Sequence, residues 1–253
     1  FTMLDTDVGL LKATVGLAFQ TSNTWLVNTA AVIRDEFNNQ ARARTNGVDA
    51  LEASSVILDV VAPRITSFVF NMRDSLLLFV FSSAVEISTM DPTTIIMQNG
   101  LSAQFTYRLT GSSLIEYATA DKTQVNVHFT LDDLRAIKLS QTIGQDRSSA
   151  YLSTAPGFVK DKFNLLSVEI SAFSALQASS YINNIPQARI TRADIDMTTG
   201  IVLLVFADVV RPTTFVPSKF AIQSQSGDDL NAIYLTGGTS TGTVGYQVTV
   251  QIT

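Results

Sequence analysis

The chain has 253 residues, of which 46% are hydrophobic and 15% are charged, enough to build a buried core in one large domain or two ordinary ones. Its net charge of −5 and the lack of any lysine or arginine cluster argue against nucleic acid or an anionic membrane as the main ligand. Because the chain has no cysteine, disulfide scaffolds and thiolate metal sites are excluded.

Strand signals dominate the chain. Residues 4–12 predict a short helix, which Gly9 weakens. The continuous apolar run Leu76–Phe81, flanked by turn residues, predicts a central strand. Ile201–Phe206 is a second run of this kind. Both runs are far too short to cross a bilayer, so no membrane span is predicted.

An alternating strand and a helix lie between these two runs. Residues 125–129 alternate apolar and polar side chains, the pattern of a half-buried strand. Thr130 follows, with the acidic Asp133 at the third helical position, which predicts the start of a short helix. Residues 248–252 repeat the alternating pattern near the end of the chain.

The strongest feature of the sequence is an internal repeat. Arg64-Ile65-Thr66 recurs as Arg189-Ile190-Thr191, 125 residues later. Further identical pairs at an offset of 125 or 126 residues are Lys12 and Lys138, Leu26 and Leu152, Asp35 and Asp161, Phe37 and Phe163, Met72 and Met197, Leu78 and Leu203, Phe81 and Phe206, and Pro92 and Pro217. The matches are colinear over nearly the whole chain, so chance explains them poorly.

The repeat predicts three segments. Residues 1–62 are the back half of a unit, residues 63–187 are one complete unit, and residues 188–253 are the front half of another. About seven short strands per unit, with turns every 8–12 residues, are typical of an immunoglobulin-like sandwich. We therefore predict an all-β protein of tandem immunoglobulin-like β-sandwiches, each with one short helix, in which a neighbouring copy completes one sandwich.

Candidate chemistry is sparse, and no enzyme is predicted. His128 is the only histidine, is expected to face solvent, and is matched by Gln251 in the other copy of its strand. No nucleophile, zinc or phosphate-binding motif is present. The acidic pairs at 5–7, 132–133 and 194–196 could bind calcium only if they converged with backbone carbonyls. Helix starts and an outward-facing strand explain them better, so no cofactor is expected. Threonine–proline stretches at 154–156 and 213–217 suggest O-linked glycans.

The repeat motifs resemble those of a known class of proteins. They are the Arg-Ile-Thr start at 64–66, the strand at 76–81, the Ser-Thr-Met-Asp-Pro turn at 88–92 and the helix at 131–138. Together they look like tandem repeats of extracellular filament proteins of protists and algae, such as mastigoneme-type proteins. They also resemble the protomer of freshwater helical glycofibrils. The resemblance implies an extracellular location, a glycan coat and subunits that join by β-strand insertion.

The leading functional hypothesis is a structural subunit of an extracellular fibril that polymerises head-to-tail with copies of itself. Residues 1–62 would donate strands and residues 188–253 would accept them, because exposed strand edges recruit missing strands. The expected assembly residues are Leu4, Val8, Leu10, Leu11, Val15, Leu17, Trp25 and Val27 on the donor and Val248, Val250 and Ile252 on the acceptor. The alternative is a cell-surface adhesin or carbohydrate-binding module, with Trp25, Tyr107 and Tyr151 as stacking residues.

Overall fold

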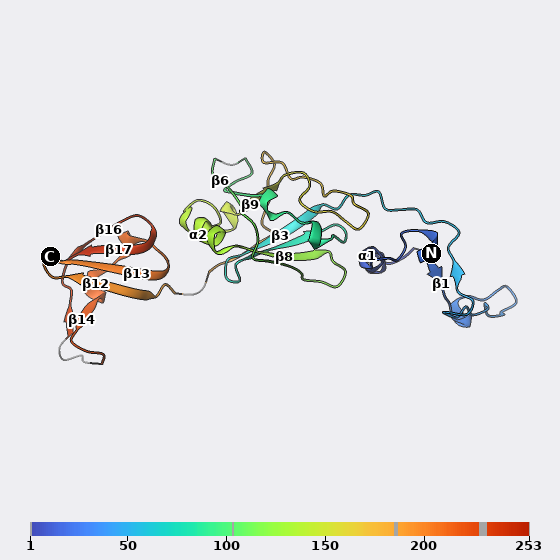
Figure 1. Cartoon of the computed structure of the whole chain (residues 1–253), viewed down its shortest axis with the longest axis horizontal. Coiled ribbons are helices and arrows are strands. Elements are labelled where there is room, and N and C mark those ends of the chain that lie inside the picture. Colours follow the sequence, from blue (N-terminus) through green and yellow to red (C-terminus); the bar gives the residue numbers. More distant parts are fainter. Residues whose placement is uncertain (1, 103, 185–186, 228–231, 253) are drawn as a thin grey trace. The chain divides into compact units, whose positions relative to one another are not determined.

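The computed structural model describes residues 2–102, 104–184, 187–227 and 232–252 (Figure 1). Strands hold 34% of the chain and helices hold 16%, so the prediction of a mainly β protein is confirmed. The chain groups into two compact units. Unit 1 contains residues 1–131 and 142–182, and unit 2 contains residues 132–141 and 183–253. The predicted donor segment thus belongs to unit 1, and the predicted acceptor segment belongs to unit 2, with its residues 228–231 and 253 outside the described residues.

Unit 1 contains a five-stranded sheet in the order β11-β3-β4-β8-β7. Its strands are β3 (Ile65–Asn71), β4 (Leu76–Phe81), β7 (Leu114–Tyr117), β8 (Gln124–His128) and β11 (Ser180–Ile182). Neighbouring strands are antiparallel except β11, which runs parallel to β3. Along β8, Val125 and Val127 are buried, whereas Gln124, Asn126 and His128 are half-buried, which confirms the predicted alternation.

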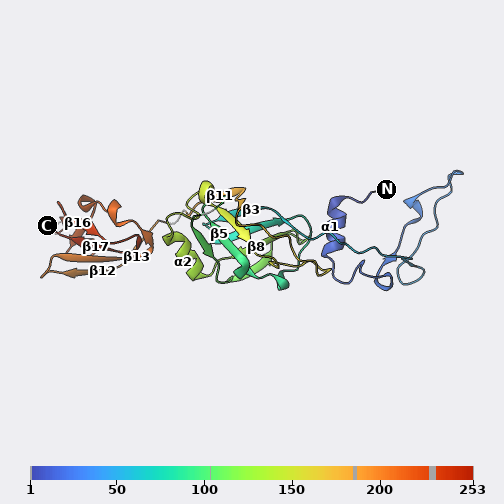
Figure 2. The same ribbon diagram turned by 90° about the horizontal axis from the view of Figure 1, so that it is seen from above.

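A second sheet of unit 1 has four strands in the order β10-β9-β5-β6. They are β5 (Ile95–Gln98), β6 (Thr106–Arg108), β9 (Tyr151–Thr154) and β10 (Leu176–Gln177). Three short 3-10 helices of this unit accompany the two sheets: η3 (Ile87–Thr89), η4 (Pro92–Thr94) and η5 (Arg147–Ser149). Figure 2 shows β3, β5 and β8 from above. Asp91 caps η4, because its Oδ1 accepts the Thr93 backbone N–H at 3.0 Å and Pro92 supplies the first helical residue.

The core of unit 1 is aromatic and draws on both sheets. The Phe158 ring, which follows β9, lies 5.3 Å from Phe79 and 6.2 Å from Phe81 of β4. Ile95 of β5 and Leu152 of β9 are fully buried as well. The apolar faces of the two sheets therefore contribute to one core, as in sandwich-type folds.

Residues 2–62 form small elements of unit 1. They are α1 (Asp5–Ala13), η1 (Thr21–Asn23), β1 (Trp25–Leu26), η2 (Ala30–Val32) and β2 (Leu51–Glu52), with β1 and β2 antiparallel. The predicted helix over residues 4–12 is therefore present as α1. Ala13 is the only buried hydrophobic residue among residues 2–62, so this segment has almost no core of its own.

Lys162 and Phe163 hold this segment in unit 1. The Lys162 Nζ donates to the backbone oxygens of Leu11 at 2.6 Å, Leu17 at 3.0 Å and Thr14 at 3.3 Å. These oxygens lie at or just beyond the C-terminal end of α1, where the helix dipole favours a positive charge. The Phe163 ring stacks on Phe19 with 5.7 Å between centroids.

Unit 2 is built on one four-stranded antiparallel sheet in the order β12-β13-β17-β16. Its elements are α2 (Leu131–Leu139, from Asp132 onward), β12 (Ile190–Asp196), β13 (Ile201–Val210), η6 (Pro212–Thr214), η7 (Pro217–Lys219), β14 (Ala221–Gln223), β15 (Ala232–Tyr234), β16 (Thr239–Thr241) and β17 (Gly245–Gln251). Strands β14 and β15 pair only with each other in the part of unit 2 that is described (Figure 1). Val202, Leu204, Val248 and Val250 form its small core.

Polar contacts tie α2 into unit 2. The Lys138 Nζ contacts both carboxylate oxygens of Asp208, at 2.9 and 2.8 Å, and Asn184 donates to the same carboxylate at 2.9 Å. The Arg135 guanidinium lies 5.9 Å from the centroid of the Tyr246 ring. The predicted helix after Thr130 therefore forms, and its basic side chains are used within this unit.

The aromatic core predicts that alanine substitution lowers the free energy of unfolding more at Phe81 than at its repeat counterpart Phe206. Phe81 is 4% exposed, so Phe81→Ala should lower the free energy of unfolding by about 3–5 kcal/mol. Phe206, its repeat counterpart, is only half-buried, so Phe206→Ala should cost about 1–2 kcal/mol in the unassembled chain. Urea denaturation of both variants measures the difference. Equal losses would contradict the assignment of Phe81 to a closed core.

Candidate assembly surface

Secondary-structure elements recur at the offset of the sequence repeat. Helices α1 and α2 begin at Asp5 and Leu131 and end at Ala13 and Leu139, so both their ends lie 126 residues apart. Strand pairs share the same register: Trp25 opposite Glu52 matches Tyr151 opposite Gln177, and Leu26 opposite Leu51 matches Leu152 opposite Leu176. The isolated bridges do so as well: Asn28 with Arg44 matches Thr154 with Ile170, and Arg34 with Gln40 matches Lys160 with Leu166.

The front half of the repeat recurs in the same way. Ile65 of β3 pairs with Phe81 of β4, and Ile190 of β12 pairs with Phe206 of β13. Each pair is followed by a register shift at the same place in the strand. Positions in 1–62 and 188–253 therefore have repeat counterparts in the complete set of strands of unit 1.

The predicted donor side chains lie largely at the surface. Leu4, Leu10, Val15, Trp25 and Val27 are exposed, with values from 49% for Leu10 to 77% for Val15. Val8, Leu11 and Leu17 are half-buried. Large contiguous patches of exposed apolar side chains are typical of interaction sites.

The predicted acceptor residues are placed differently. Val248 and Val250 are 3% and 1% exposed and belong to the core of unit 2, and Ile252 packs against that core. Their side chains are therefore already packed within unit 2. Only Val248 among the three lines the cavity of this unit.

This cavity is an apolar hollow in unit 2. It has a volume of about 390 Å³ and lies against β13, η6 and η7. Leu204 and Phe206 form its apolar floor, and Arg211, Thr214 and Val216 lie along its rim. No sequence pattern predicts it, because the rim residues lie in and around two short 3-10 helices and have no periodic pattern.

The floor of the cavity has an occupied counterpart in unit 1. The residues equivalent to Leu204 and Phe206 are Phe79 and Phe81, and the ring of Phe158 packs on both. Phe158 is fully buried there. The counterpart of the cavity floor is therefore covered by an aromatic side chain from another segment of the repeat.

The rim has an occupied counterpart as well. The backbone N–H groups of Glu86 and Asp91 donate to the backbone oxygens of Lys160 and Phe158, both at 2.8 Å. The Thr89 Oγ1 accepts the Lys160 backbone N–H at 2.9 Å. Glu86, Thr89 and Asp91 are equivalent to Arg211, Thr214 and Val216. Residues 158–160 thus occupy the position in unit 1 that corresponds to the cavity of unit 2.

The repeat counterparts of residues 158–160 are residues 32–34, which sequence analysis missed as assembly residues. Val32 and Ile33 are 62% and 67% exposed, whereas Phe158 and Val159 are fully buried. A signal was available, because Val32 and Ile33 lie three and two residues before Asp35, which is matched to Asp161. Carrying the repeat three residues upstream would have identified it.

Two equivalent aspartates report the same contrast in burial. The Oδ1 of Asp161 accepts the backbone N–H groups of Phe163 and Leu165 at 2.8 and 2.9 Å, and Asp35 accepts those of Phe37 and Asn39 at 2.9 Å each. Asp161 is 5% exposed, and burial raises the pKa of its carboxyl group. Asp35 is exposed, and the hydrogen bond from the Asn39 side chain lowers the pKa of its carboxyl group.

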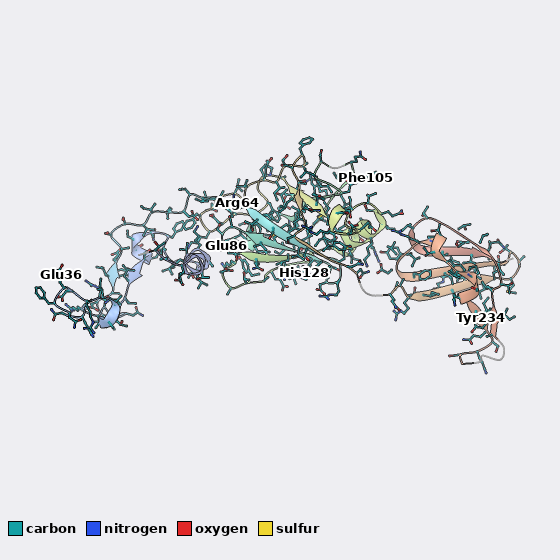
Figure 3. The ribbon with its side chains drawn as sticks, turned by 180° about the vertical axis from the view of Figure 1, so that it is seen from behind. Glu36, Arg64, Glu86, Phe105, His128 and Tyr234 are labelled. Atoms are coloured by element: carbon teal, nitrogen blue, oxygen red, sulfur yellow. The ribbon has the colours of Figure 1, made fainter. Side chains whose placement is uncertain are left out.

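The residues of the alternative hypothesis do not form one site. Trp25 is 52% exposed and lies beside a hollow of about 400 Å³ lined by residues 46–48 and Ala50. Tyr107 and Tyr151 are half-buried on β6 and β9. His128 lies 3.4 Å from the Glu116 carboxylate (Figure 3). Among the described residues, no group of three or more carboxylates or histidines is arranged to hold a metal ion.

Comparisons with known proteins give no further assignment. No family model matches the sequence, and no curated protein matches it. In the part of the chain that is described, no helix is both long and apolar enough to span a bilayer.

The two aspartates predict opposite effects of pH on stability. The folded-state pKa of Asp161 lies above 3.8, so its carboxyl group should destabilise the fold as the pH rises from about 3 to 6. Asp161→Asn should therefore gain stability relative to the wild type over this range. The pKa of Asp35 lies below 3.8, so Asp35→Asn should lose relative stability over the same range. Urea midpoints measured across this range test both signs, and parallel trends in the two variants would contradict the difference in burial.

Proposed function

We propose that this chain is a structural subunit of an extracellular fibril, in which unit 2 of one copy is completed by residues 1–62 of the next. One observation carries the proposal. The position equivalent to the cavity of unit 2 is filled in unit 1 by residues 158–160, and the repeat counterparts of these residues, 32–34, lie exposed. Burying Val32 and Ile33 in this cavity would remove apolar surface from water on both partners.

The division of the chain into two units favours a second copy as the partner that completes unit 2. Residues 1–62 group with unit 1, to which Lys162 and Phe163 bind the end of α1 and Phe19. Lys12 and Asp59 form an ion pair in the same unit. A donor segment already bound in unit 1 of its own chain remains available to unit 2 of another.

The donor and acceptor surfaces differ, so the contact is heterologous. Each copy carries one of each, and such contacts propagate into filaments unless the rotation closes a ring. The resemblance to tandem immunoglobulin-like repeats of extracellular filament proteins agrees with this assembly. The proposal needs no catalytic residue and no cofactor, and it places O-linked glycans on the outside of the fibre.

A carbohydrate-binding adhesin is the second candidate, and the exposed ring of Trp25 beside its hollow favours it. Electron microscopy of the purified chain separates the two functions. A fibril subunit forms filaments, whereas an adhesin remains as monodisperse particles. Binding of soluble oligosaccharides that quenches the fluorescence of Trp25, the only tryptophan, would support the adhesin.

Val32 provides the sharpest test of assembly. Val32→Asp should block filament formation, because it places a carboxylate in the apolar cavity of the next copy. A cost of about 3 kcal/mol would raise the critical concentration for assembly more than about a hundredfold. Sedimentation and electron microscopy measure the loss.

Val48→Asp is the matched control. Val48 is 81% exposed, and its repeat counterpart Phe173 is 82% exposed, so this position should remain in solvent after assembly. Val48→Asp should therefore form filaments like the wild type. Normal filaments from Val32→Asp, or equal losses from both variants, would contradict the proposed contact.

A further inference from the structure

Strand β12 has an open edge whose counterpart in unit 1 is paired. In the sheet of unit 2, β12 is the terminal strand, and among the described residues it pairs only with β13. Its counterpart β3 pairs with β4 on one side and with β11 on the other. Six of the seven residues of β12 are exposed, whereas four of the seven residues of β3 are buried.

The partner of β3 comes from the back half of the repeat. Ser180, Tyr181 and Ile182 of β11 run parallel to β3, opposite Val69, Phe70 and Asn71. Two flanking hydrogen bonds extend the contact: the Ser179 backbone N–H donates to Phe68 at 2.8 Å, and the Met72 backbone N–H donates to Ile182 at 2.8 Å. The Ser179 hydroxyl also donates to the Phe68 oxygen at 2.8 Å.

The donor segment contains the counterpart of this strand. Ala53-Ser54-Ser55 is identical to Ala178-Ser179-Ser180, so the anchoring serine is present as Ser54. Residues 53–62 form no strand in the single chain, and Ile57 is 95% exposed. These residues thus carry the sequence of an added strand without its partner.

The side chains that would meet are matched in type. Tyr181 stacks on Phe70 at 5.6 Å, and their counterparts are Val56 and Ile195. An aromatic pair in unit 1 is therefore replaced by an aliphatic pair in the added strand. Arg192, Asp194 and Asp196 place charges along β12, which disfavours pairing with unrelated strands.

We infer that residues 54–57 of a second copy add to the open edge of β12 as a parallel strand, with Ser55 opposite Asp194, Val56 opposite Ile195 and Ile57 opposite Asp196. This inference rests on the proposed function and specifies its register. A slip of one residue would turn every side chain of the strand to the other face of the sheet.

Cysteine cross-linking tests the register, because the chain has no cysteine of its own. Two single variants, Ser55→Cys and Asp194→Cys, are mixed under assembly conditions and oxidised. Adjacent strands lie about 4.8 Å apart, within the range that a disulfide can bridge. The expected product is a mixed disulfide that moves from 27.4 kDa to twice that mass on a non-reducing gel.

Two controls use the same chain. In unit 1, Val69 of β3 and Ser180 of β11 are the pair equivalent to Asp194 and Ser55, and we call them the template pair. The double variant Val69→Cys with Ser180→Cys should therefore form an intrachain disulfide. Ser55→Cys mixed with Ile195→Cys represents the one-residue slip, in which the thiols point to opposite faces, and it should remain unlinked.

The outcomes separate this inference from the proposed function. If filaments form and the template pair oxidises, but residues 55 and 194 do not cross-link, the inferred register is wrong. The proposed function as a fibril subunit is not contradicted by that result. The absence of filaments together with the absence of any interchain cross-link would overturn both the inferred register and the proposed function. An intrachain disulfide in the double variant Ser55→Cys with Asp194→Cys would show that the strand comes from the same chain, which overturns the second copy as donor.

Discussion

The contact of Phe158 with Phe79 and Phe81 is the interaction on which the complete fold depends. A sheet with one apolar face is stable only when another layer covers that face. In unit 1 the segment that follows β9 supplies this cover: its aromatic ring packs on β4, and its backbone hydrogen-bonds to the segment after β4. Phe79 and Phe158 are consequently fully buried, and the strands of both sheets share one core.

Unit 2 repeats the first sheet without the cover. Its strands β12, β13 and β17 keep the pairing register of β3, β4 and β8, but Phe206 is half-buried where Phe81 is buried. The repeat counterparts of the covering segment lie within residues 1–62, which hold one buried hydrophobic residue among those described. In the proposed assembly, association would be driven by burial of these apolar surfaces, since hydrophobic burial scales with the apolar area removed from water.

Polar side chains adapt each copy of the repeat to its surroundings. Lys12 and Lys138 are repeat counterparts, yet Lys12 pairs with Asp59 and Lys138 pairs with Asp208. In both places a lysine on the helix binds a carboxylate, although the carboxylate comes from a different position of the repeat. Glu36, the counterpart of Lys162, lies exposed on the donor segment (Figure 3). The repeat therefore preserves its apolar framework more closely than its charges.

The sequence alone determined the repeat offset, the mainly β composition, both short helices and the alternation along β8, because each depends on local periodicity and on identities between residues of one chain. The tertiary structure decided which of these residues are covered. Val248 and Val250, expected to contribute an edge or core to the assembly, belong to the core of unit 2, while Val32, Ile33 and Ile57, which carry no periodic signal, are exposed. Burial depends on which segments meet in space. Phe158 is 79 residues from Phe79 along the chain, and Ser180 of β11 is 111 residues from Val69 of β3, so no local pattern specifies these contacts.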